Sequence, residues 1–149
     1  SYHEIACQMV LLGAGLGPTT APATESILGS VAADKAGIGS AVNDTTRELG
    51  GTLGVAVIGS VVCSVYIGAL DDAPVDGAFS NLPPEAQELT RESVGAAQFV
   101  AGELGPAANA YLAEVNDAFL SGLAVGCLVA AGVAYTGAVF ASRFLPARA

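Results

Sequence analysis

Charged residues are scarce in this sequence, and the few basic ones are scattered. Asp, Glu, Lys and Arg make up 13% of its 149 residues, whereas a soluble domain carries about 25%. The basic side chains are Lys35, Arg47, Arg91, Arg143 and Arg148, against 14 acidic ones. Nucleic-acid binding requires clustered Lys and Arg to neutralise phosphates. The sequence therefore predicts no nucleic-acid partner, and much of the chain is expected to avoid water.

Cysteine and histidine are too few and too dispersed to form a metal site. Cys7, Cys63 and Cys127 form no CxxC motif, and His3 is the single histidine. Each cysteine lies in an apolar run, which predicts a small buried side chain rather than a zinc ligand or a disulfide. The sequence also lacks a nucleophile–base pair and a phosphate-binding loop. We therefore expect no enzyme, no metal and no resident cofactor.

Three long stretches contain no charged residue at all. They run over residues 5–24, 49–70 and 118–142, and each reaches the roughly 20 residues that a helix needs to cross a bilayer. Buried helices of a soluble bundle would instead show a polar stripe at helical spacing. The pattern predicts an all-α integral membrane protein with three transmembrane helices, at about residues 5–28, 42–70 and 118–142.

The long connection over residues 71–117 is acidic and contains four prolines. A short helix is expected to start near Pro83 with Asn81 as its cap, because proline is tolerated in a first turn. That helix should weaken at Gly95, and a second helix should start after Pro106 and continue into the last span. The sequence thus predicts a long, partly helical loop.

The basic residues predict the orientation of the spans. The short loop and the C-terminus carry Lys35, Arg47, Arg143 and Arg148, whereas the other side carries only Arg91. Because cytoplasmic segments are enriched in Lys and Arg, the C-terminus is expected in the cytoplasm and the acidic loop outside.

Small residues recur at intervals of four in each predicted span, which is typical of helices that pack closely. Pro18 and Pro22 lie within the first span and predict a kink, which would suit either a transport path or a purely structural bend. Glu25 continues the same face near the cytoplasmic end. It is either a functional intramembrane carboxylate or a solvated interfacial one. The small residues are Gly13, Gly17 and Ala21; Ala56, Ser60, Ser64 and Gly68; and Gly122, Gly126, Ala130, Ala134 and Ala138.

One helical face joins a polar end to a glycine track. Asn43, Arg47, Gly50 or Gly51, and Gly54 follow one another at spacings of three or four, so they share a side of the helix. Arg47 can reach a phosphate or a carboxylate on a neighbouring helix. The face is therefore either an interfacial anchor with helix packing or a cytoplasmic gate whose Arg–carboxylate contacts change during transport.

Two stretches resemble a known transporter family. They are P-x-T-x-S-I-x-G at residues 22–29 and KAGIGSAVNDTTRELGGTLGVAVIGS at residues 35–60. Both are similar to the late helices of the EmrB/QacA type of the major facilitator superfamily, the fourteen-helix drug:proton antiporters. The resemblance covers nearly the whole chain but only the last three helices of the family, and the proton-coupling acids of its N-terminal half have no counterpart here.

The resemblance implies part of a proton-coupled efflux transporter that works by alternating access in the cell membrane. Its energy source would be the proton gradient, and its partners would be the N-terminal transporter helices, the lipid bilayer and an amphipathic small molecule. Asn43, Arg47, Gly50, Gly51 and Gly54 would act in gating or helix packing. The sequence starts at Ser1 without a signal-peptide pattern, which favours a C-terminal fragment. The alternative is a small non-transporting three-span protein or degenerate fragment that acts as an assembly partner.

Overall fold

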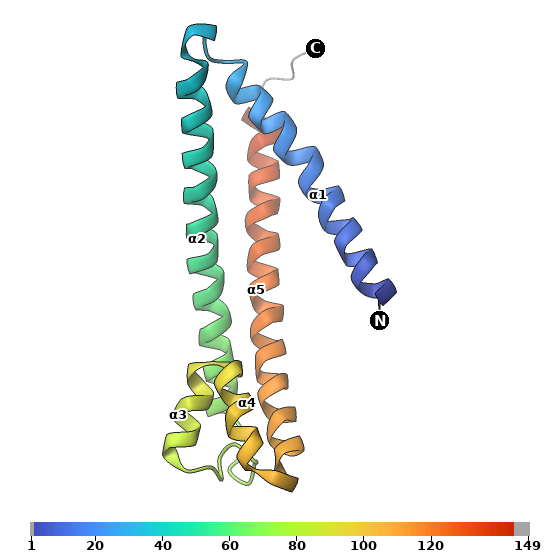
Figure 1. Ribbon diagram of the computed structural model, residues 1–149, viewed down its shortest axis with the longest axis vertical. Helices are drawn as coiled ribbons and strands as arrows, with labels where there is room; N and C mark the ends of the chain where they lie inside the picture. Colours follow the sequence, from blue (N-terminus) through green and yellow to red (C-terminus); the bar gives the residue numbers. More distant parts are fainter. Residues whose placement is uncertain (1, 145–149) are drawn as a thin grey trace. The chain divides into compact units, whose positions relative to one another are not determined.

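The computed structural model describes residues 2–144, and every regular element within that range is a helix. Arg148, which contributed to the expected orientation, lies outside the described residues. The elements are α1 (Tyr2–Leu28), η1 (Ala33–Lys35), α2 (Ala36–Asp71), α3 (Pro84–Glu92), α4 (Val94–Glu103), η2 (Gly105–Ala107) and α5 (Ala108–Phe144), with η denoting a 3-10 helix (Figure 1). The described chain divides into two compact units with their boundary between Thr52 and Leu53, so α2 contributes to both.

Two of these helices are long and apolar enough to cross a membrane. The qualifying stretches are Ala33–Asp71 and Gly105–Phe144, and only 11% and 6% of their most apolar residues are buried within the chain. α1 has 27 residues, but its C-terminal half contains Pro18, Pro22 and Glu25 among several threonines, which lower its mean hydropathy. The third expected span, at residues 5–28, therefore stays a prediction.

The first unit contains α1, the connection over residues 29–35 and the first half of α2. α1 runs without interruption through Pro18 and Pro22 and has no buried residue. Both prolines remove a backbone donor from the helix. The hydroxyls of Thr19 and Thr20 bond to the carbonyl oxygen of Leu16 at 3.0 and 2.9 Å, as threonines inside helices often do. The expected kink stays a prediction.

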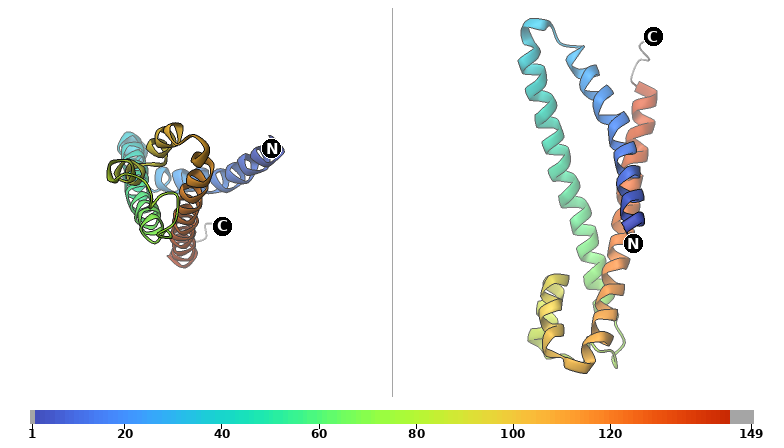
Figure 2. Two further views of the ribbon diagram at one scale, coloured as in Figure 1. Left: turned by 90° about the horizontal axis from the view of Figure 1, so that it is seen from below. Right: turned by 45° about the vertical axis from the view of Figure 1, so that its right-hand side comes forward.

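The second unit holds the hydrophobic core of the described residues. The core side chains come from the end of α2, from the connection before α3, from α4 and from the start of α5: Tyr66, Leu70, Phe79, Leu82, Ala97, Val100, Ala101, Tyr111, Val115 and Ala118. Figure 2 shows α3 and α4 folded back beside the beginning of α5. The 71–117 segment is therefore a small packed domain built on two long helices rather than an open loop.

The structure corrects two expectations about α3. Its first turn starts at Pro84 with Pro83 as N-cap and has no side-chain cap, because the amide of Asn81 donates instead to the Gly77 carbonyl at 2.8 Å. The helix ends at Glu92 rather than weakening at Gly95. Ser93 adopts an extended conformation and its hydroxyl accepts a hydrogen bond from the Ala96 amide, so it caps a new helix, α4, as serine favours. The helix expected after Pro106 is present as α5.

The small residues of α5 are used where it meets α2. A Cβ placed on Gly122 would lie 2.7 Å from the Val62 carbonyl oxygen, and one on Gly126 would lie 2.5 Å from a methyl of Val62. This confirms close packing for these two glycines. The partner face on α2 carries Ile58 and Val62, not the predicted stripe that contains Ser60 and Ser64, because branched side chains fill the hollow that the glycines leave.

The cysteines correct a third expectation. Cys7, Cys63 and Cys127 are all exposed, whereas apolar surroundings had predicted burial. Each lies on a helix face that no described part of the chain covers. An apolar run predicts avoidance of water, but it does not say whether protein or lipid replaces the water.

Candidate functional site

The sequence-predicted polar residues gather where α1 returns into α2. α1 ends at Leu28, and the Ser30 hydroxyl closes the turn by donating to the Ile27 carbonyl at 2.7 Å. Gly39 in the first turn of α2 then meets this end of α1: its added Cβ would lie 3.2 Å from a Val31 methyl and 3.6 Å from a Leu28 methyl. α1 and α2 thus form a helical hairpin, and close contact at Gly39 holds its loop end together.

Above this contact lies an open groove of about 620 Å³, here called the α1–α2 groove. It is lined by Thr20, Ala21, Thr24, Glu25, Leu28, Gly29 and Arg47. Six of these residues belong to α1 or its end, and only Arg47 comes from α2. The groove therefore brings together Glu25 and Arg47, two residues that the sequence had marked for separate reasons.

The two charges share the groove without direct contact. No ion pair joins Glu25 to Arg47 within the described residues. The other charges nearby on α2 are Asp44 and Glu48, and neither lines the groove. The walls are otherwise formed by alanine, leucine, glycine and two threonines, so the groove is apolar with one charge of each sign.

Asn43 is the buried polar residue of this unit. Its side chain is only 7% exposed, and it lies one turn from Gly39 and one turn from Arg47 on the same side of α2. No described residue forms a hydrogen bond with its side chain. Among the described residues every fully buried side-chain nitrogen or oxygen has a hydrogen-bond partner, so the amide of Asn43, which has none, keeps contact with solvent.

The remaining predicted site residues lie apart from this groove. A Cβ added to Gly50, Gly51 or Gly54 would meet nothing within 4 Å, so the glycine track is uncovered in the described chain. Pro18 and Pro22 lie inside α1 and do not line the groove. The structure thus brings Glu25 and Arg47 into one groove, whereas Asn43 is not among the residues that line it, and it shows no contact for the glycines.

Sequence reasoning missed a second set of polar contacts, in the 71–117 domain. Both carboxylate oxygens of Glu114 accept backbone hydrogen bonds at 2.9 Å, one from Ala78 and one from Phe79. The Tyr66 hydroxyl donates to the Thr90 carbonyl at 2.7 Å, and the Thr90 hydroxyl lies 2.7 Å from that of Tyr111. Tyr66, Thr90 and Tyr111 are all buried. A hydroxyl inside a charge-free run could have drawn attention to Tyr66, but Thr90 lies between charged residues and gave no such signal.

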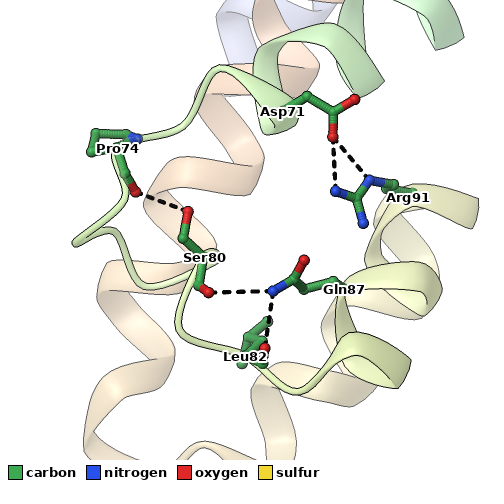
Figure 3. Close-up of polar contacts among 6 residues, drawn as sticks. All are labelled: Asp71, Pro74, Ser80, Leu82, Gln87 and Arg91. Atoms are coloured by element: carbon green, nitrogen blue, oxygen red, sulfur yellow. Dashed lines mark hydrogen bonds and ion pairs between the residues drawn. The ribbon is translucent and has the colours of Figure 1, made fainter.

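The surface of this domain is held by further contacts (Figure 3). Arg91 forms a 2.8 Å ion pair with Asp71, and its guanidinium lies 5.2 Å from the centre of the Phe79 ring. The Gln87 amide donates to the carbonyls of Leu82 at 2.9 Å and Ser80 at 3.3 Å. These contacts tie α3 to the end of α2 and to the turn before α3, which gives the domain a defined shape.

The chain is similar to two bacterial export proteins. It is 36% identical over 129 residues to the multidrug efflux pump LfrA of Mycolicibacterium smegmatis (strain ATCC 700084 / mc(2)155), an alignment that covers 85% of this chain and 24% of the relative. It is 33% identical over 137 residues to the tetracenomycin C resistance and export protein of Streptomyces glaucescens, covering 89% and 25%. The chain spans about a quarter of the length of these curated relatives.

No family model matches the chain, and no solved structure matches it. The similarity to the two export proteins is therefore an observation about sequence, and it extends over both units of the structure.

Proposed function

We propose that this chain is part of a membrane transporter that exports amphipathic small molecules. The observation that carries the proposal is the similarity to two export proteins over 85% and 89% of the chain. Because the chain spans about a quarter of their length, the remaining helices of the transporter are its first partners. The family type is that of the EmrB/QacA drug:proton antiporters, with this chain supplying the last three helices.

The uncovered helix surfaces support this proposal. Leu11, Val55, Leu128 and Val133 are each at least 66% exposed in the described chain, and soluble proteins rarely leave such apolar helices open to water. In a membrane, lipid and neighbouring helices would cover these faces, and the uncovered glycines would allow close approach. This supports α1 as a third span beside α2 and α5.

The proposed topology places the C-terminus in the cytoplasm and the 71–117 domain outside, in the plasma or inner membrane. The energy source is the proton gradient, so no bound cofactor is needed. In alternating access, two helical bundles rock about a central site. The described helices would belong to the second bundle, with Asn43 and Arg47 at its cytoplasmic edge.

The test is export by the complete polypeptide in which this sequence occurs. Cells that lack their own efflux pumps are loaded with a fluorescent amphipathic dye, and dye loss is followed with and without expression. We expect faster loss on expression, and a proton ionophore should abolish the difference. If dye loss is faster but resists the ionophore, proton coupling is excluded and the proposal of an export function stands. A short product that inserts stably but exports no member of a dye panel would favour the assembly-partner function instead.

The topology is tested separately by thiol labelling. Cys7, Cys63 and Cys127 are first replaced by serine, and one cysteine is then introduced at Asp76 or at Lys35. A membrane-impermeant maleimide should label intact cells at position 76 but not at position 35. The reverse pattern would invert the proposed orientation without affecting the transporter proposal.

A further inference from the structure

We propose that Glu25 and Arg47 form an ion pair across the α1–α2 groove, and that this pair closes the cytoplasmic end of the hairpin in one state of the transport cycle. The pairing rests on the geometry of the first unit alone, whereas its role in the cycle rests on the proposed function. Glu25 is then a positioning residue for Arg47 rather than an independent intramembrane carboxylate.

Glu25 and Arg47 lie within reach of each other along their helices. The hairpin is closed where Gly39 meets Leu28. Glu25 lies three residues from Leu28 and Arg47 lies eight residues from Gly39, so their backbones are about 4.5 and 12 Å from the contact at 1.5 Å per residue. The difference in level is about 7.5 Å, a gap that two long side chains can bridge.

The two side chains lean toward the same level of the groove. A helical side chain points back toward the N-terminus of its own helix. α1 and α2 run in opposite directions from the turn at residues 29–35, so Glu25 leans away from the closed end and Arg47 leans toward it. The carboxylate and the guanidinium are therefore inclined toward the same level of the groove.

Neither charge has another partner among residues 2–144. Among the described residues neither Glu25 nor Arg47 takes part in an ion pair or a side-chain hydrogen bond. α1 carries only one other charged residue, Glu4, which lies near the opposite end. Asp44 and Glu48 lie on α2 itself and cannot join the two helices. A charge at the membrane edge is less costly when it is paired.

Asn43 fits the same arrangement. It is 7% exposed, has no hydrogen bond from its side chain, and lies one turn below Arg47 toward the closed end. When the groove closes, its amide can donate to a carboxylate oxygen of Glu25. Such a bond would leave Arg47 able to hold the other oxygen, so the two α2 residues would bind one carboxylate from α1.

The experiment uses the complete polypeptide in membranes, with the three native cysteines replaced by serine. The double variant Glu25→Cys/Arg47→Cys is treated with a short thiol cross-linker, and Glu25→Cys/Glu48→Cys is the matched control. Glu48 is adjacent to Arg47 but points about 100° away around α2. We expect cross-linking of the first pair well above that of the second. Cross-linking is detected after cleavage at an engineered protease site between residues 29 and 35, because only cross-linked molecules keep their two fragments joined.

Equal cross-linking of the two pairs would overturn the pairing. This measurement needs no export, so it decides the pairing even where the proposed function fails.

The role in transport is tested by reversing the charges. Glu25→Arg and Arg47→Glu each place like charges across the groove, and each should lower the initial export rate about fivefold, at the low end of known coupling between linked states. The double variant Glu25→Arg/Arg47→Glu should recover most of the rate, and Glu25→Asp should retain it. A double variant no faster than the single variants, at equal amounts of protein in the membrane, would overturn the proposed role.

Discussion

The hydroxyl of Tyr66, near the end of α2, donates a 2.7 Å hydrogen bond to the backbone carbonyl of Thr90, twenty-four residues farther along the chain. The same threonine meets the hydroxyl of Tyr111 on α5 through its own side chain at 2.7 Å. One residue of α3 therefore links the two long apolar helices of the second unit. The 71–117 domain is anchored on both helices at once, which makes its stability a direct measure of how they are held together.

Removing the Tyr66 hydroxyl should loosen this anchor. Tyr66→Phe leaves the buried Thr90 carbonyl without its donor, and we expect a loss of about 1–3 kcal/mol. The measurement is the midpoint of thermal unfolding of the purified protein in detergent. Tyr135→Phe is the matched control, because Tyr135 is 73% exposed and donates no hydrogen bond within the described residues. Equal effects of the two variants would contradict the proposed anchor.

The Glu114 carboxylate should protect the turn before α3 from opening. Its two oxygens accept the amides of Ala78 and Phe79, and hydrogen bonds to a charged acceptor are stronger than neutral ones. Glu114→Gln keeps one acceptor and turns an NH₂ group toward the other amide. Hydrogen exchange at residues 78 and 79 should become about tenfold faster or more, from a loss of at least 1.4 kcal/mol. Glu103→Gln, at an exposed position, should leave this exchange unchanged.

Gly77 should tolerate no side chain. A Cβ at this position would lie 2.8 Å from the Pro74 carbonyl oxygen and 3.0 Å from a carboxylate oxygen of Glu114. Gly77→Ala should therefore destabilise the domain by about 1–3 kcal/mol through overpacking. Limited proteolysis of the 71–117 segment measures this as faster cleavage. Gly102→Ala is the control, since its Cβ would meet nothing within 4 Å, and faster cleavage there as well would point to a general effect of alanine.

Gly122 should be required for the crossing of α5 over α2. The 2.7 Å distance from its added Cβ to the Val62 carbonyl involves backbone, which cannot move aside as a flexible side chain can. Gly122→Ala should push the helices apart and lower the thermal midpoint, with a cost of about 1–3 kcal/mol. At Gly126 the nearest atom is a methyl of Val62, so Gly126→Ala should cost less. The opposite order would contradict this packing.

The ion pair between Asp71 and Arg91 should contribute little by comparison. Their side chains are 52% and 28% exposed, and exposed pairs contribute about 0–1 kcal/mol. Asp71→Asn should shift the thermal midpoint less than Tyr66→Phe does, and the shift should shrink as salt is added. A larger effect than that of the buried tyrosine would contradict this ranking and would mean that the ion pair is a main stabilising contact of the domain.

Several features followed from the sequence alone because they depend on neighbouring residues. Charge-free runs predicted the long helices α2 and α5, and the proline after Gly105 predicted where α5 begins. Glycines four apart predicted the close approach at Gly122 and Gly126. The boundary between α3 and α4 was predicted at Gly95 but lies at Ser93. A serine cap ends one helix and starts the next, whereas a glycine only weakens a helix.

Only the tertiary structure could decide which distant residues meet. Glu114 reaches the amides of residues 78 and 79 across more than thirty residues, and Glu25 shares a groove with Arg47 because a turn at residues 29–35 sends α2 back along α1. The periodicity of a helix tells which residues share its face, but not which face of another helix it meets. That choice depends on how side chains such as Val62 fill the space beside Gly122, and this packing is a property of the folded chain as a whole.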